Sequence, residues 1–237
     1  MGTGTHTCIR FARTVISAVG VILAVMISGF VLESSSGWTS TEMALIRQVN
    51  KAHTPQLDSV ALGINWLFEP AAAGLLVLLV TGVILLVTRR PRTAIHFFLI
   101  VIIPTLGAEA MKLLVHRPRP DIPSLTHILV LEPGGLSFPS GHTSFAACFV
   151  LGFVVLTAGR RYRPVLIGAS TIVVLGTAAS RVYLGVHYPS DVVASIVYSM
   201  AAVALTDAVW NLSLSHWIDR RSGVHAGPEY EGAADAR

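Results

Sequence analysis

Residues 14–32 read TVISAVGVILAVMISGFVL and contain no charged side chain. A helix of about 20 mostly apolar residues is long enough to cross the hydrocarbon core of a bilayer. Arg10 and Arg13 precede this stretch, and the residues that follow it, ESSSGW, do not form the small-residue site at which a signal peptide is cleaved. The stretch therefore predicts an uncleaved first membrane span.

The composition of the whole chain agrees with a membrane protein. Of its 237 residues, 53% are hydrophobic and only 13% are charged, whereas a soluble domain carries about 25% charged residues. These values exclude both a soluble globular enzyme and a disordered chain. The net charge of +4 does not indicate binding to nucleic acid, because the basic residues form short clusters between apolar runs. The two cysteines, Cys8 and Cys148, are too few and too distant to predict a disulfide framework.

Further apolar runs predict an all-α fold, a bundle of six transmembrane helices. Basic clusters join or follow these runs at Arg89–Arg92, Gly159–Arg163 and Asp219–Arg221. With six spans, the clusters and both termini lie on one side, which the positive-inside rule identifies as the cytoplasm. We expect one multi-pass domain over residues 1–221 in the cytoplasmic membrane and a disordered cytoplasmic tail at 222–237. The additional spans are expected at Glu69–Thr88, Thr93–Val115, His142–Ala158, Val165–Ser180 and Ser190–Leu214.

The three remaining loops are then expected on the outer face. Within the first, Thr39-Ser40-Thr41-Glu42 has the pattern of a capping box and predicts the start of a short helix. Its apolar face would carry Met43, Ile46 and Val49, and the helix would either lie on the outer membrane surface or pack on the bundle. The outer loops are Glu33–Phe68, His116–Gly141 and Arg181–Pro189.

These outer loops and the adjoining helix ends contain ionisable residues in three clusters. The clusters are KLLVHRPRP at 112–120, PSGH at 139–142 and SRVYLGVHYPSD at 180–191. Charged groups in or beside a bilayer are costly, so they indicate a functional site. Snorkelling to lipid headgroups explains a single cation, but it does not explain why several gather on one face.

The clusters combine the groups that bind a phosphate. Lys112, Arg119 and Arg181 provide charges that neutralise phosphate oxygens during phosphoryl transfer. Ser140 and Gly141 begin a helix whose N-terminal amides are suited to an anion, and glycine permits close approach of the backbone. The outer loops contain no acidic cluster suited to Mg²⁺, so the sequence predicts no metal and no cofactor.

The same clusters contain a candidate nucleophile and a candidate acid. His187 and Asp191 are four residues apart, one helical turn, so the carboxylate can orient the imidazole while the other ring nitrogen attacks. His142 would protonate the departing oxygen as general acid. The sequence therefore predicts a catalytic group of His187, Asp191 and His142.

In these three motifs the chain resembles the type 2 phosphatidic acid phosphatase superfamily, which also includes the glucose-6-phosphatases and the vanadium haloperoxidases. Residues 45–60, LIRQVNKAHTPQLDSV, also resemble the outer helix of bacterial members, although this signal is much weaker. The motif positions match completely at Lys112, Arg119, Pro120, Pro139, Ser140, Gly141, His142, Ser180, Arg181, His187 and Asp191.

The resemblance implies a metal-independent reaction through a phosphohistidine. His187 would be the nucleophile, Asp191 would orient it, and His142 would serve the leaving group and then activate water. The phosphate would be held by Lys112, Arg119, Ser140, Gly141 and Arg181.

Several neighbouring residues have two interpretations each. Glu109 either forms an intrahelical ion pair with the lysine three residues later or tunes that lysine directly. Arg117 and Asp121 flank the first motif and are candidates for the rim of the site, where they would meet lipid headgroups. Tyr183 and Tyr188 are candidates for a lipid entrance, although tyrosine is common at membrane interfaces.

The expected substrate is a membrane lipid phosphate. Topology favours a polyprenyl diphosphate, namely undecaprenyl diphosphate, which is recycled on the outer face for cell-wall synthesis. Phosphatidic acid and phosphatidylglycerophosphate are the glycerolipid alternatives. A protein that binds or transports an anionic lipid without hydrolysing it is the alternative from another class. The complete pair of His187 and Asp191 argues against that alternative, because capture alone needs cations and no nucleophile.

Overall fold

The structure is a computed structural model that describes residues 2–132 and 135–221, with side chains described from residue 9 to 212. All of the named secondary-structure elements in these residues are helices. The predicted tail at 222–237 and the side chains of Cys8 and of 219–221 lie outside this range. The helices are α1 (Gly2–Ser34), α2 (Ser36–Asn50), α3 (Pro55–Leu67), α4 (Pro70–Thr88), α5 (Pro91–Val115), the 3₁₀ turn η1 (Ile122–Ser124), α6 (Gly141–Leu156), α7 (Arg163–Tyr183) and α8 (Pro189–Arg221).

Five of these helices, α1, α4, α5, α7 and α8, are long and apolar enough to cross a membrane. The predicted all-α, multi-pass architecture is therefore confirmed. The run expected to form the remaining span is α6, which is apolar but only 16 residues long. The count of six spans remains a prediction.

The helix ends follow from local chemistry. Pro55, Pro70, Pro91 and Pro189 each stand at the first helical position, where the missing amide hydrogen costs nothing and the fixed φ suits a helix. At the other end of α5, His116 adopts the left-handed conformation with φ of 57°. This residue ends α5 and directs the chain into the first motif.

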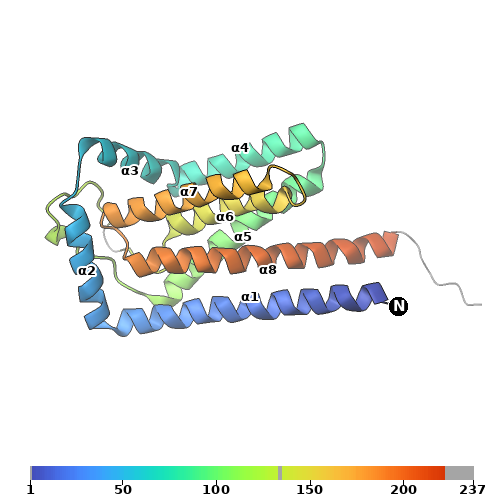
Figure 1. Cartoon of the computed structure of the whole chain (residues 1–237), viewed down its shortest axis with the longest axis horizontal. Coiled ribbons are helices and arrows are strands. Elements are labelled where there is room, and N and C mark those ends of the chain that lie inside the picture. The colour runs from blue at the N-terminus through green and yellow to red at the C-terminus, as the bar shows by residue number, and fades with distance from the viewer. Residues whose placement is uncertain (1, 133–134, 222–237) are drawn as a thin grey trace, which may run out of the picture.

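The bundle separates its basic connections from its motif-bearing loops (Figure 1). α1 lies beside α8, and α6 packs against α5, α7 and α8. The α4–α5 and α6–α7 connections lie at the same end of the bundle as the N-terminus and the end of α8, whereas α2 and α3 lie at the opposite end. The connections that carry the basic clusters therefore lie at one end of the bundle, as the positive-inside pattern predicted.

Paired serines join α6 to α8. The Ser195 hydroxyl donates to the Ser140 carbonyl at 3.2 Å, and the Ser199 hydroxyl donates to the Ser144 carbonyl at 3.3 Å. Because both pairs are four residues apart, successive helical turns meet at this interface, and small residues allow the two backbones to approach closely. This interface ties the second motif, at the start of α6, to the third, at the start of α8.

The segment between α1 and α4 differs from its prediction. The predicted capping box is wrong: α2 begins at Ser36, and the Ser40 and Thr41 hydroxyls donate to the Gly37 carbonyl within the helix. Met43 and Ile46 are buried against Leu125 and Tyr188, so α2 packs on neighbouring protein. Residues 45–60, which resemble a single outer helix, instead include the end of α2, a break at 51–54 and the start of α3, so a second helix before α4 was not predicted.

The start of the third motif also differs. α7 continues to Tyr183, so Arg181 lies in its last turn and not in the loop in which it was expected. The backbone of Arg181 is therefore held by the helical hydrogen bonds of α7.

Candidate active site

The three sequence motifs meet at one cavity of about 520 Å³ at the α2–α3 end of the bundle. Its wall includes residues from α3, α4, α5 and α6 and from the connections before α6 and α8. The predicted residues that line it are Lys112, Arg119, Gly141, His142 and His187.

A short pairing of extended segments positions the first motif. The Ser137 amide donates to the Arg117 carbonyl at 2.8 Å, and Pro118 and Leu136 form an isolated antiparallel bridge. The pairing holds the chain that follows α5 against the chain that leads into α6. Arg119 is thereby placed beside the third motif, where it donates to the Val186 carbonyl at 2.8 Å.

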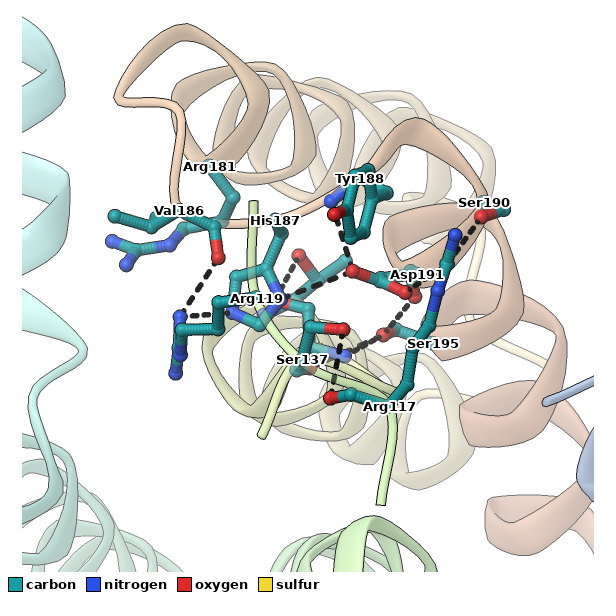
Figure 2. Close-up of polar contacts among 12 residues, drawn as sticks. Arg117, Arg119, Ser137, Arg181, Val186, His187, Tyr188, Ser190, Asp191 and Ser195 are labelled. Carbon is teal, nitrogen blue, oxygen red and sulfur yellow. Dashed lines mark hydrogen bonds and ion pairs between the residues drawn. The ribbon is translucent and has the colours of Figure 1, made fainter. Parts of the chain in front are cut away.

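His187 lies between Arg119 and Asp191 (Figure 2). Its Nε2 is 3.2 Å from Arg119 Nη1, and its Nδ1 is 3.5 Å from Asp191 Oδ2. Because a guanidinium nitrogen only donates, Nε2 must accept, which places the imidazole proton on Nδ1 facing the carboxylate. Gly185, with φ of 71°, makes the turn that brings His187 into the site. The predicted pair is therefore adjacent, with Nε2 toward the cations.

The surroundings of His187 favour its neutral form. Burial, followed by the positive charges of Arg119, Arg181 and Lys112, lowers the pKa of His187 well below its usual value of 6.5. A neutral imidazole has a lone pair available for attack. The site therefore keeps this histidine in the form that a nucleophile requires.

Glu132 joins two of the predicted phosphate-binding cations. Its Oε2 lies 2.5 Å from Arg119 Nη2, and its Oε1 lies 2.6 Å from Arg181 Nη2. Arg181 is fully buried, and its Nη1 donates to Asn65 Oδ1 on α3. Neither Glu132 nor Asn65 was predicted from the sequence. Neither residue lies in a recognisable motif, so no local signal identified them.

The remaining cavity groups are held from α3 and α5. His142 Nε2 lies 3.2 Å from the Asn65 carbonyl, which accepts a hydrogen bond when Nε2 is protonated. Lys112 Nζ lies 2.9 Å from both carboxylate oxygens of Glu109, so the ion pair considered from the sequence is present. A Cβ at Gly141 would collide with Glu109 and lie 3.3 Å from Lys112 Nζ. Glycine therefore lets the lysine approach the start of α6.

Ser140 occupies a different position from the cavity-lining residues. It is fully buried and forms the N-cap of α6, where its hydroxyl accepts from the Thr143 amide at 3.4 Å. Its own amide donates to the Ser195 hydroxyl at 2.8 Å. Contact of this serine with phosphate remains a prediction.

The predicted place of Arg117 on the rim is wrong. Its side chain is only 1% exposed and bridges Glu42 and Asp191. Tyr188 is also buried, and the Arg117 guanidinium lies over its ring at 4.2 Å. Neither residue lines the cavity, because both pack behind the His187–Asp191 pair. Asp121 is exposed.

Within the described side chains, no three His, Cys, Asp or Glu residues are grouped closely enough to hold a metal ion. The independence of the reaction from metal is a prediction that solution experiments must test.

Comparison with known proteins agrees with the motifs. The sequence profile of the PAP2 superfamily matches residues 93–213. Phosphatidylglycerophosphatase B of Bacillus subtilis is 32% identical over 179 residues, which cover 73% of this chain and 81% of that protein. Decaprenylphosphoryl-5-phosphoribose phosphatase of Mycobacterium tuberculosis is 36% identical over 104 residues, 43% of this chain and 52% of the relative. The chain thus matches about half the length of this mycobacterial relative.

The fold is similar as well. The crystal structure of a transmembrane PAP2-type phosphatidylglycerolphosphate phosphatase from Bacillus subtilis superposes with a TM-score of 0.68 and 22% identity, covering 86% of this chain and 98% of that chain. Since the superfamily profile matches more than half of the sequence and includes all three motifs, the chain belongs to the PAP2 superfamily.

Proposed function

We propose that this protein is a membrane phosphatase that removes the terminal phosphate from a lipid phosphate through a phosphohistidine. The observation that carries the proposal is the position of His187 at a cavity lined by Lys112 and Arg119, with its Nε2 directed at the arginine. A site for capture alone requires cations but no buried imidazole backed by a carboxylate. The geometry therefore favours hydrolysis over binding or transport.

The first step would transfer the phosphoryl group to the protein. His187 Nε2 attacks phosphorus and the bond from phosphorus to the lipid oxygen breaks. His142 enters this step as an imidazolium and donates its proton to that oxygen, becoming neutral. Lys112, Arg119 and Arg181 neutralise the charge on the phosphoryl oxygens. In the second step His142 takes a proton from water, the water oxygen bonds to phosphorus, and the phosphorus–nitrogen bond breaks to release phosphate.

The apolar wall of the cavity suits a lipid. Pro70, Ala73 and Gly74 of α4 and Ile102 and Leu106 of α5 line it beside the charged groups. This arrangement allows the phosphate to enter the site while the chains remain in the bilayer.

Two lipid classes are supported by the relatives. Undecaprenyl diphosphate is the first candidate, since the mycobacterial relative is named for a decaprenyl-linked substrate. Phosphatidylglycerophosphate is the second, since the Bacillus relative is named for it. Phosphatidic acid is the third lipid to test.

The proposal includes the orientation of the protein. α6 would be the sixth span, because it packs among α5, α7 and α8. The basic connections at 89–92 and 159–163 lie at the end of the bundle opposite the site, which under the positive-inside rule supports an extracytoplasmic site.

Purified protein in detergent should release phosphate from at least one of the three lipids with EDTA present. His187→Ala should lower turnover at least about 10³-fold, because the nucleophile is absent, while lipid binding persists. The measurements are phosphate release and equilibrium binding of the same lipid. Full turnover by His187→Ala would contradict the mechanism, and lipid binding without hydrolysis by the wild type would favour the capture alternative.

The lowered pKa of His187 predicts that this histidine gains its proton at a lower pH than an ordinary histidine does. As pH falls through 6.5, an ordinary histidine gains a proton, whereas His187 should remain neutral because burial and nearby cations oppose protonation. The ring carbon signal of ¹³C-labelled histidine, assigned by its loss in His187→Ala, should keep its neutral position at pH 6.5 and titrate only below it. A midpoint at or above pH 6.5 would contradict the electrostatic account.

Glu132 should compete with the substrate for the same cations. A phosphate that contacts both Arg119 and Arg181 must displace this carboxylate, so Glu132→Gln should lower KM about 10-fold, the order expected for one charge-assisted hydrogen bond. Inorganic phosphate should also inhibit the variant more strongly. Asp121→Asn, an exposed change in the same loop, is the control. A higher KM for Glu132→Gln would show that the carboxylate supports the arginines during binding.

A further inference from the structure

A buried chain of charges links α2 to the candidate catalytic pair. Arg117 Nη2 lies 2.8 Å from Glu42 Oε2, and Arg117 Nη1 lies 2.6 Å from Asp191 Oδ1. The exposed fractions of the three side chains are 1%, 7% and 0%. One guanidinium thus holds two carboxylates, one from α2 and one from α8.

Glu42 also contacts the first turn of α8. Its Oε1 accepts from the Ser190 amide at 2.7 Å, and its Oε2 accepts from the Ser190 hydroxyl at 2.8 Å. The Ser190 hydroxyl accepts from Arg117 Nη1 at 2.7 Å, so all three side chains are connected. Amides in the first helical turn have no partner within the helix, and a carboxylate there is favourable. Glu42 therefore helps to fix the start of the helix that carries Asp191.

The contacts of Asp191 are divided between its two oxygens. Oδ1 accepts from Arg117, while Oδ2 accepts from the Tyr188 amide at 2.8 Å and faces His187 Nδ1 (Figure 2). Because Arg117 holds Oδ1, the carboxylate cannot rotate Oδ2 away from the histidine without losing a charge-assisted hydrogen bond. The ring of Tyr188 packs against the same guanidinium. Arg117 therefore restrains both the carboxylate and the chain next to His187.

We propose that Glu42 and Arg117 are positioning residues that hold Asp191 in the orientation His187 needs during phosphoryl transfer. The inference rests on the proposed function, since it assigns a role within the same site. Neither residue lines the cavity, so neither contacts the substrate phosphate in this role. Their loss should slow the chemical step and leave phosphate binding intact.

The contact of Arg117 with two carboxylates at once, one through each terminal nitrogen, can be tested by substitution. Lysine keeps the positive charge but has one ammonium group, which cannot reproduce the planar, two-pronged contact. Arg117→Lys should therefore leave Asp191 less restrained. Glu42→Gln keeps the shape of the side chain but removes its charge, which leaves Arg117 with one charged partner.

The experiment is steady-state phosphate release by the full-length variants in detergent, on the lipid that the wild type hydrolyses best. Arg117→Lys and Glu42→Gln should each lower kcat about 10-fold, with KM within about twofold of the wild type. Residues that orient metal ligands in metalloenzymes cost about 10-fold to 100-fold when removed, and we take the smaller value for this histidine. Matched controls are Arg47→Lys and Glu33→Gln, two exposed positions outside the site, which should keep wild-type kcat. Thermal unfolding of each variant checks that it is folded.

Ser190→Ala provides a milder variant should a charged substitution prevent folding. It removes the hydroxyl between Glu42 and Arg117 without changing a charge, and kcat should fall about twofold to fivefold at unchanged KM. Wild-type kcat in all three folded variants, or a change in KM alone, would overturn the positioning role. An inactive wild type, or a fully active His187→Ala variant, would instead overturn the proposed function, so the two failures are distinguishable.

Discussion

Burial of arginine beside the candidate active site is the constraint on which the α2–α3 end of this protein depends. A guanidinium taken out of water is tolerated only when carboxylates and hydrogen-bond acceptors compensate for the lost hydration. Arg117 obtains that compensation from Glu42 and Asp191, and Arg181 obtains it from Glu132 and Asn65. These partners come from α2, α3, α8 and the connection before α6. The requirement to pair two arginines therefore draws four distant segments together over the ends of the spans.

The two arginines separate the site into a reacting side and a supporting side. Arg181 and Arg119 lie on the opposite side of His187 from Arg117 (Figure 2), and the carboxylate that they share, Glu132, lines the cavity. Arg117 lies behind Asp191, with both of its carboxylate partners buried. In the proposed mechanism, an incoming phosphate replaces Glu132 at Arg119 and Arg181. The contacts of Arg117 with Glu42 and Asp191 are closed to solvent. This difference in burial and partners supports the proposed roles, in which Arg181 binds phosphate and Arg117 acts through Asp191.

The sequence predicted the features that depend on local pattern. The lengths of the apolar runs indicated the long spans. The three motifs predicted that Lys112, Arg119, His142 and His187 would share one site, and all four line one cavity. The sequence did not reveal Glu42, Asn65 and Glu132, because each is a single polar residue with a partner far along the chain: Ser190 for Glu42 and Arg181 for the other two. The capping-box interpretation failed for the same reason: Glu42 is held by distant partners and does not cap its own helix.

If His187 carries the phosphoryl group, alkaline quenching during turnover followed by peptide mass spectrometry should detect the phosphorylated histidine. Alkali is needed because phosphohistidine is labile in acid. The account predicts phosphate on the peptide that contains His187, transient in the wild type and absent from His187→Ala. Persistent accumulation in His142→Ala would agree with His142 activating water. Phosphate on another residue, or sustained turnover with no phosphorylated His187 at any time point, would contradict the account.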